Sequence, residues 1–117
     1  MSMIAVSHIA IGVRDMEKSL GYYRDVLGLR VTADRIEEFP QGPGEPWARR
    51  RAVFLRWSDD PLSTYVLLDQ QLTKETKGSA QDLYTAGFHH FGFWVPDLKP
   101  IMDRARAANR AAGERRA

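Results

Sequence analysis

The sequence predicts one α+β domain in which a βαβββ module is followed by a second, incomplete βα repeat. Three observations predict this fold. Several short runs alternate apolar side chains with other residues, as strands do with period two. Two longer stretches carry apolar residues at helical spacing. A nine-residue pattern occurs twice in the 117 residues, a length that fits one domain.

The repeated pattern marks the first strand of each module. Residues 8–16 read His-Ile-Ala-Ile-Gly-Val-Arg-Asp-Met, and residues 90–98 read His-Phe-Gly-Phe-Trp-Val-Pro-Asp-Leu. Alternation places the bulky apolar residues of each copy on one face and the histidine with mostly small residues on the other. We expect the bulky face to pack on a helix, which leaves space in front of the histidine.

A helix is predicted after each copy of the pattern. Asp15 and Asp97 are suitable N-cap residues, because their carboxylates accept a hydrogen bond from the first helical turn. Apolar residues recur at helical spacing from residue 16 to 27, and Gly28 is a typical left-handed residue at a helix end. A second apolar stripe covers residues 98–108.

Three further strands are predicted between the helices, at residues 29–38, 51–57 and 64–70. Residues 39–49 are rich in Gly and Pro and predict a loop, and residues 58–63 predict a turn, so the last two strands form a hairpin. The polar residues 71–88 predict a connecting loop. The single domain of residues 1–117 thus comprises a first module (1–70), this connection (71–88) and a partial second module (89–117).

Composition narrows the function classes. There are no cysteines, which excludes disulfides and thiolate metal sites, and no apolar run long enough to span a membrane, so we expect a cytoplasmic protein. The net charge of +2 is uneven: residues 98–117 hold six basic and two acidic residues. This basic tail has no aromatic residue for stacking, so we expect no nucleic-acid partner but a solvated charged face. A weakly bound anionic partner is the alternative.

The residues of both copies, 7–16 and 89–98, together with Tyr22, Tyr23 and the segment 26–29, resemble the vicinal-oxygen-chelate (VOC) superfamily. This superfamily includes glyoxalases, bleomycin-resistance proteins and extradiol dioxygenases. The resemblance implies the glyoxalase/bleomycin resistance/dihydroxybiphenyl dioxygenase-like fold, in which a mixed sheet curls into a cup around a small ligand. It says little about the reaction, because one fold hosts many functions.

The resemblance also implies a metal site. His8 and His90 match the positions from which metal-using members take a ligand, and Asp69 is a third candidate. Leu67 stands where such members usually have a glutamate. Two imidazoles and a carboxylate suit a divalent ion of Fe, Zn, Ni or Mn. The alternative is that both histidines are structural and that Asp69 only ends a strand.

Four residues are candidates for contact with a substrate. Trp94, Trp57 and Tyr65 offer planar rings for a planar ligand, and His89 could act as a general acid or base. Core packing is the alternative for Trp94, and His89 could simply begin a strand. The catalytic residues themselves cannot be named from the sequence.

Two functions therefore remain open at this point. One is a metal-dependent lyase, isomerase or ring-cleaving dioxygenase acting on a small substrate with vicinal oxygens. The other is a metal-free protein that binds a drug or aromatic compound, as in bleomycin resistance. An incomplete second sheet would leave unpaired backbone groups at an edge, so we also expect a homodimer.

Overall fold

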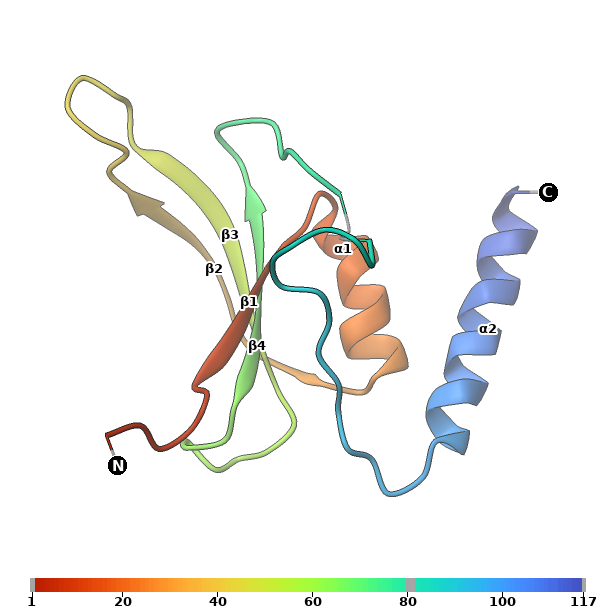
Figure 1. Ribbon diagram of the computed structural model, residues 1–117. Helices are drawn as coiled ribbons and strands as arrows, with labels where there is room; N and C mark the ends of the chain where they lie inside the picture. Colours follow the sequence, from red (N-terminus) through yellow and green to blue (C-terminus); the bar gives the residue numbers. More distant parts are fainter. Residues whose placement is uncertain (1, 80–81, 117) are drawn as a thin grey trace.

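The computed structural model describes residues 2–79 and 82–116, which build a four-stranded mixed sheet with its helices on one side (Figure 1). The strand order is β1-β4-β3-β2, with β1 parallel to β4 and the other neighbours antiparallel. The strands are β1 (His8–Gly12), β2 (Arg30–Phe39), β3 (Ala48–Arg56) and β4 (Tyr65–Gln71). The predicted α+β fold and its βαβββ order are confirmed, and the strand bounds differ from those predicted by one to three residues.

The first helix begins where the sequence predicts. Helix α1 (Met16–Leu20) continues directly into the π-helical segment η1 (Gly21–Val26). The side chain of Asp15 accepts a hydrogen bond of 3.2 Å from the backbone N–H of Lys18, which is the predicted N-cap. Gly28 has φ of +82°, a conformation that a residue with a Cβ rarely adopts, and it ends the helical segment.

The core lies between this helix and the sheet. The alternation of β3 and β4 sends one set of apolar side chains toward α1, where they are fully buried. The core cluster consists of Met16, Leu20, Leu29, Val53, Leu55, Val66 and Leu68. The first module is therefore a packed unit in which one face of the sheet is covered by the helix.

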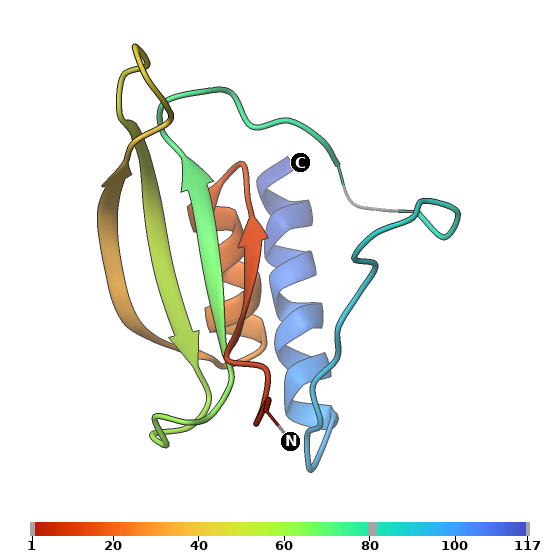
Figure 2. The same cartoon turned by 60° about the vertical axis from the view of Figure 1, so that its left-hand side comes forward.

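The second copy of the repeated pattern behaves differently from the first. Residues 90–95 make no strand pairing in the structure, so the strand predicted there is wrong. An extended segment becomes a strand only when its backbone groups find partners, and no described segment pairs with this one. Figure 2 shows it passing outside the sheet. Residues 80 and 81 of the predicted connection lie outside the described residues.

Helix α2 (Lys99–Arg116) follows this segment. Asp97 accepts a hydrogen bond of 3.0 Å from the backbone N–H of Lys99, as the repeat predicts. The helix meets the first module mainly at η1, where Arg104 donates a hydrogen bond of 2.8 Å to the backbone carbonyl of Val26. Among the described helices, none is long and apolar enough to cross a membrane.

Candidate functional site

One face of the sheet carries no helix in the described part of the chain, because α1 and α2 both lie on the other side (Figures 1 and 2). We call it the helix-free face. The strand register brings its side chains into rows that cross β1, β4 and β3. Its side chains include those of His8, Ala10, Arg30, Arg35, Glu37, Arg50, Ala52, Phe54, Arg56, Tyr65, Leu67, Asp69 and Gln71.

The first row combines two rings and a guanidinium group. The His8 and Tyr65 rings are stacked, with centroids 5.0 Å apart and planes inclined by 13°. On β3, the guanidinium carbon of Arg56 lies 4.4 Å from the centroid of the Tyr65 ring. Such stacking of an arginine on an aromatic ring is a cation–π contact. The three side chains form a continuous cross-strand row, which we call the donor row because each can donate a hydrogen bond at its tip.

An apolar row follows two residues further along the strands. Leu67 pairs with Ala10 on one side and with Phe54 on the other. Leu67 is 5% exposed, so its neighbours cover it almost completely. The guanidinium carbon of Arg35 lies 4.7 Å from the Phe54 ring centroid. A planar molecule lying on this row would meet apolar atoms.

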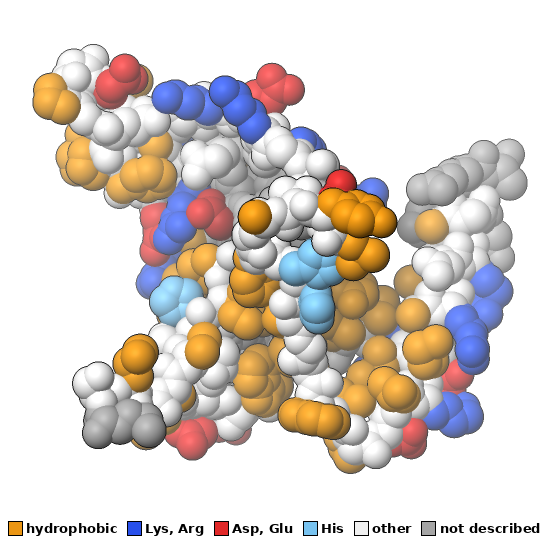
Figure 3. Space-filling model, viewed as in Figure 1, with side chains coloured by type: hydrophobic (Ala, Val, Ile, Leu, Met, Phe, Trp, Pro, Cys, Tyr) orange, Lys and Arg blue, Asp and Glu red, His pale blue; other side chains and the backbone are white. Residues whose placement is uncertain are grey.

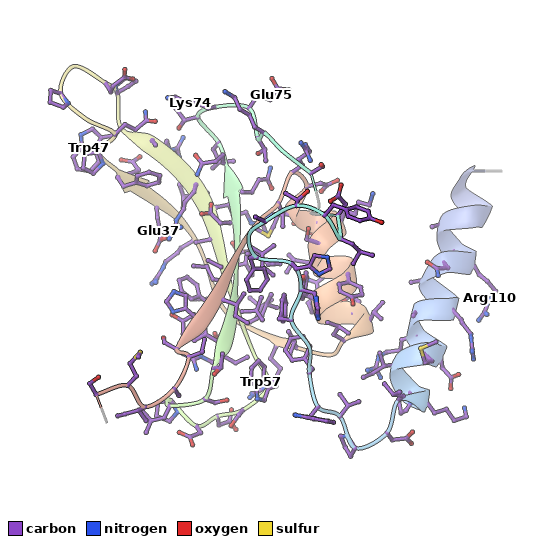
Figure 4. All side chains as sticks on the ribbon, in the orientation of Figure 1. Glu37, Trp47, Trp57, Lys74, Glu75 and Arg110 are labelled. Atoms are coloured by element: carbon purple, nitrogen blue, oxygen red, sulfur yellow. The ribbon has the colours of Figure 1, made fainter. Side chains whose placement is uncertain are left out.

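An ion-pair network forms the far end of the face. Arg50 donates hydrogen bonds of 2.7 Å to Asp69 and 2.8 Å to Glu37, whose side chain is visible on β2 in Figure 4. The hydrogen bond from Arg50 holds the pKa of Glu37 below its ordinary value. The second oxygen of Asp69, Oδ1, is buried and has no hydrogen-bond partner among the described residues. A ligand group that donates a hydrogen bond would satisfy it.

The three predicted metal ligands are not brought together. His8 pairs in register with Tyr65, whereas Asp69 lies four residues further along β4, about 13 Å at the usual rise of a strand. Ligand bonds of about 2.0–2.2 Å cannot bridge that separation without large movements. Histidine side chains lie in separate places on the surface (Figure 3). The described residues contain no group of three His, Asp or Glu side chains that could hold a metal ion.

The residues that the sequence proposes for substrate contact are also dispersed. Tyr65 lies in the donor row. His89 and His90 line a pocket of about 830 Å³ between β1 and the segment 88–98, with 2.7 Å between their Nδ1 atoms. Trp57 and Trp94 line a neighbouring pocket of about 550 Å³. The structure thus places these residues in at least two regions, the helix-free face and the pockets beside β1.

The two tryptophans differ in their surroundings. Trp57, at the end of β3 in Figure 4, packs edge-to-face against Phe93 with ring centroids 5.5 Å apart. Trp94 is fully exposed. Trp94 is therefore not packed in the core, which was the alternative to ligand contact.

Sequence reasoning missed Arg50, Arg56 and Phe54, which dominate the helix-free face. Their signal was present in the alternation of β3, because Val53 and Leu55 occupy the opposite parity. The segment 50–56 could have been read as a strand with one apolar face and one face of arginine and aromatic side chains. That reading would have identified the face, but not the stacking across strands.

Comparison with known proteins agrees with this fold. The model of the family described as Glyoxalase/Bleomycin resistance protein/Dioxygenase superfamily matches residues 7–115. The structure is similar to that of a glyoxalase family protein from Bacillus cereus, with a TM-score of 0.71 and 14% sequence identity, over 92% of this chain and 73% of that chain. No protein with a curated description matches the sequence.

Proposed function

Because the chain belongs to the glyoxalase/bleomycin resistance protein/dioxygenase superfamily, we propose that it binds a small planar organic compound on its helix-free face without a metal ion. The observation that carries the proposal is the donor row of His8, Tyr65 and Arg56 beside an apolar row. Aromatic and apolar side chains with a few polar groups are typical of small-molecule sites. The proposal corresponds to the bleomycin-resistance type of function rather than to catalysis.

The residues of this chain do not fit a resident metal ion. Asp69 is held by Arg50, its register keeps it away from His8, and Leu67 supplies no ligand atom at the intervening position. His90 lies on a segment that is not part of the sheet.

A metal-dependent lyase, isomerase or dioxygenase is the second candidate, with His8, His90 and Asp69 as ligands. One observation favours it: the unpartnered buried oxygen Asp69 Oδ1 is the kind of atom that a cation would bind. In that case a rearrangement of the segment 88–98 would have to bring His90 to the sheet.

Metal content separates the two candidates. Protein prepared without an affinity tag is exposed in turn to Zn(II), Ni(II), Mn(II) and Fe(II), dialysed and subjected to elemental analysis. We expect well under one equivalent of each metal. One equivalent that is lost in the His8→Ala/His90→Ala double variant but kept in His89→Ala would contradict metal-free binding and support the enzyme.

Ligand binding tests the proposed face directly. The neutral planar probe 2-naphthamide is titrated while the backbone amide NMR signals are followed. At about 0.3 kcal/mol for each of about 13 non-hydrogen atoms, the expected Kd is about 1 mM. The signals of residues 65–69 should shift, and Tyr65→Ala should weaken the binding while Trp94→Ala leaves it unchanged. The reverse pattern would place the ligand in the pockets beside β1 instead.

We also propose that the protein forms a homodimer through the free edge of β1. The backbone N–H of Val13 donates to Asp69 and the carbonyl of Ser7 accepts from Tyr65, both on β4. By strand alternation, the backbone groups of His8, Ala10 and Gly12 point the other way, and no described strand pairs with them. Such an edge favours pairing with another chain.

A proline at residue 10 tests this association. Ala10→Pro removes an outward-pointing N–H, so it should weaken the dimer without breaking the β1–β4 ladder. Ala10→Thr keeps the donor and is the control. Light scattering at micromolar concentration should give the mass of two chains for the natural protein and the control, and of one chain for Ala10→Pro. A natural protein that is monomeric would refute the proposal.

A further inference from the structure

We propose that the donor row binds an oxyanion, so that the ligand of the helix-free face is a planar aromatic carboxylate or a compound of the same charge and shape. This inference rests on the proposed function and names the chemical class of its ligand. Three features of the face carry it: an arginine that has no carboxylate partner among the described residues, hydrogen-bond donors gathered in one row, and an apolar row beside that row.

Arg56 differs from the other arginines of β3. Arg49, Arg50 and Arg51 each form an ion pair with a carboxylate, at distances of 2.7 to 3.3 Å. Arg56 has no such pair among the described residues and donates only to the backbone carbonyl of Ser63, at 3.3 Å. A half-buried guanidinium group with spare donors is a strong site for a carboxylate, because charge-assisted hydrogen bonds exceed neutral ones.

On the β4 side, the neighbours of Arg56 add donors, and on the β2 side its register partner Arg30 is paired with Asp59 at 2.6 Å. The Tyr65 hydroxyl and a ring N–H of His8 stand in the same cross-strand row, since the His8 and Tyr65 rings are nearly parallel. The ring faces of Tyr65 are in contact with His8 and Arg56, so a ligand meets the tips of the row and not the ring face. The tips together suit an oxygen-rich, negatively charged group.

Acidic side chains of the face lie far from this row. Glu37 and Asp69 are gathered around Arg50, six residues from Arg56 on β3, or about 20 Å at the usual rise of a strand. They are already neutralised in part by Arg50. An anion at the donor row therefore meets little repulsion from them at physiological ionic strength.

The apolar row fixes the shape of the rest of the ligand. Ala10, Leu67 and Phe54 begin two residues from the donor row, about 7 Å along the strands. Ala10 is exposed and Phe54 is partly exposed, so a flat ring can lie over these two side chains, while Leu67 itself is almost completely covered. A ring system attached directly to a carboxylate would place its anion on the donor row and its rings on the apolar row.

A matched pair of probes tests the inference. Binding of 2-naphthoate and of neutral 2-naphthamide, which have the same size and shape, is measured by titration with backbone amide NMR detection. We expect 2-naphthoate to bind about tenfold more tightly, the effect of one charge-assisted hydrogen-bonded pair. Arg56→Gln should abolish this preference. Arg49→Gln removes the same charge from the opposite face of the same strand and should keep it.

A second variant covers the case in which Arg56→Gln does not fold. Tyr65→Phe removes only the hydroxyl donor and should reduce the preference about threefold while leaving the affinity for 2-naphthamide unchanged. Equal affinities of the natural protein for the two probes would overturn the inference and leave the proposed function standing. Binding of neither probe would overturn both. A preference that survives in Arg56→Gln and in Tyr65→Phe would also overturn the inference.

Discussion

The two copies of the repeated pattern have the same chemistry but different structures. In the first copy, His8–Gly12 pair with β4, and Ile11 and Val13 pack against the core. In residues 90–98, the corresponding segment pairs with no described strand, Phe93 is 36% exposed and Trp94 is fully exposed. The Asp at the end of each copy nevertheless caps the first turn of its helix.

The difference shows which structural features a short sequence pattern can specify without a partner from elsewhere in the chain. A helix cap needs only a side chain and the next backbone turn, so it forms in both copies. A strand needs hydrogen-bond partners from another part of the chain, so it forms only where β4 is available. Alternating apolar residues predict the face that a strand would bury, but not that a partner exists.

Hydrogen exchange should show the largest contrast between β4, the strand that pairs with the first copy, and the second copy. Amides of residues 66–68, in the centre of the sheet, open only with global or near-global unfolding, whereas amides of residues 91–95 have no strand partner. We expect exchange to be about 1000-fold slower in the first group, given ordinary domain stability. Mass spectrometry or NMR of exchanging protein gives both values in one sample.

Similar protection in the two groups would contradict the comparison. Protection of residues 91–95 that grows with protein concentration would instead mean that a second copy supplies the missing partner. This outcome would support the homodimer while changing the surface through which it forms.

Truncation of one large side chain in each region should give the next largest effect. Leu68 is fully buried between the sheet and α1, so Leu68→Ala should lower the free energy of unfolding by about 2–5 kcal/mol. Trp94 is fully exposed, and Trp94→Ala should change the free energy of unfolding by less than about 0.5 kcal/mol. Urea denaturation measures both. A cost above about 1 kcal/mol for Trp94→Ala would mean that a partner covers this side chain in solution.

The sequence predicted the first module well because its signals are local and agree with one another. Asp15 and Gly28 bound the helical segment, and alternation defines the strands and their buried faces. The family resemblance carried by residues 7–16 and 89–98 is confirmed by the match over residues 7–115. The strand at 90–95 was predicted from the same alternation and is wrong, because alternation carries no information about partners.

The site was harder to predict than the fold. Tyr65 and His8 were identified singly, but their stacking depends on the register between β1 and β4. The position of Arg56 over Tyr65 depends on the register of β3 as well. The sequence offers Asp69 as a metal ligand or as the end of a strand, and neither interpretation predicts its hydrogen bond from Arg50 on β3. Register between strands is a tertiary property that a single sequence does not display.

The ion pairs of the helix-free face should have the smallest of these effects on stability, and a pH dependence identifies them. Arg50→Gln leaves Asp69 and Glu37, which are 21% and 29% exposed, without this guanidinium group, at a cost of about 1–2 kcal/mol near neutral pH. The pKa of Glu37 is lowered in the folded protein by its hydrogen bond from Arg50. Its contribution is therefore present above the ordinary pKa of about 4.5 and is lost as the pH falls through the lower folded value. The difference in unfolding free energy between natural protein and variant should then shrink below about pH 4.5, as measured by urea denaturation at several pH values.

The control variant is Arg24→Gln, at an exposed pair with the adjacent Asp25, which should cause no measurable change in unfolding free energy at any pH. A difference for Arg50→Gln that stays constant down to pH values well below the ordinary range of a glutamate would show that the guanidinium group stabilises the fold by packing on the sheet and not by pairing with Glu37.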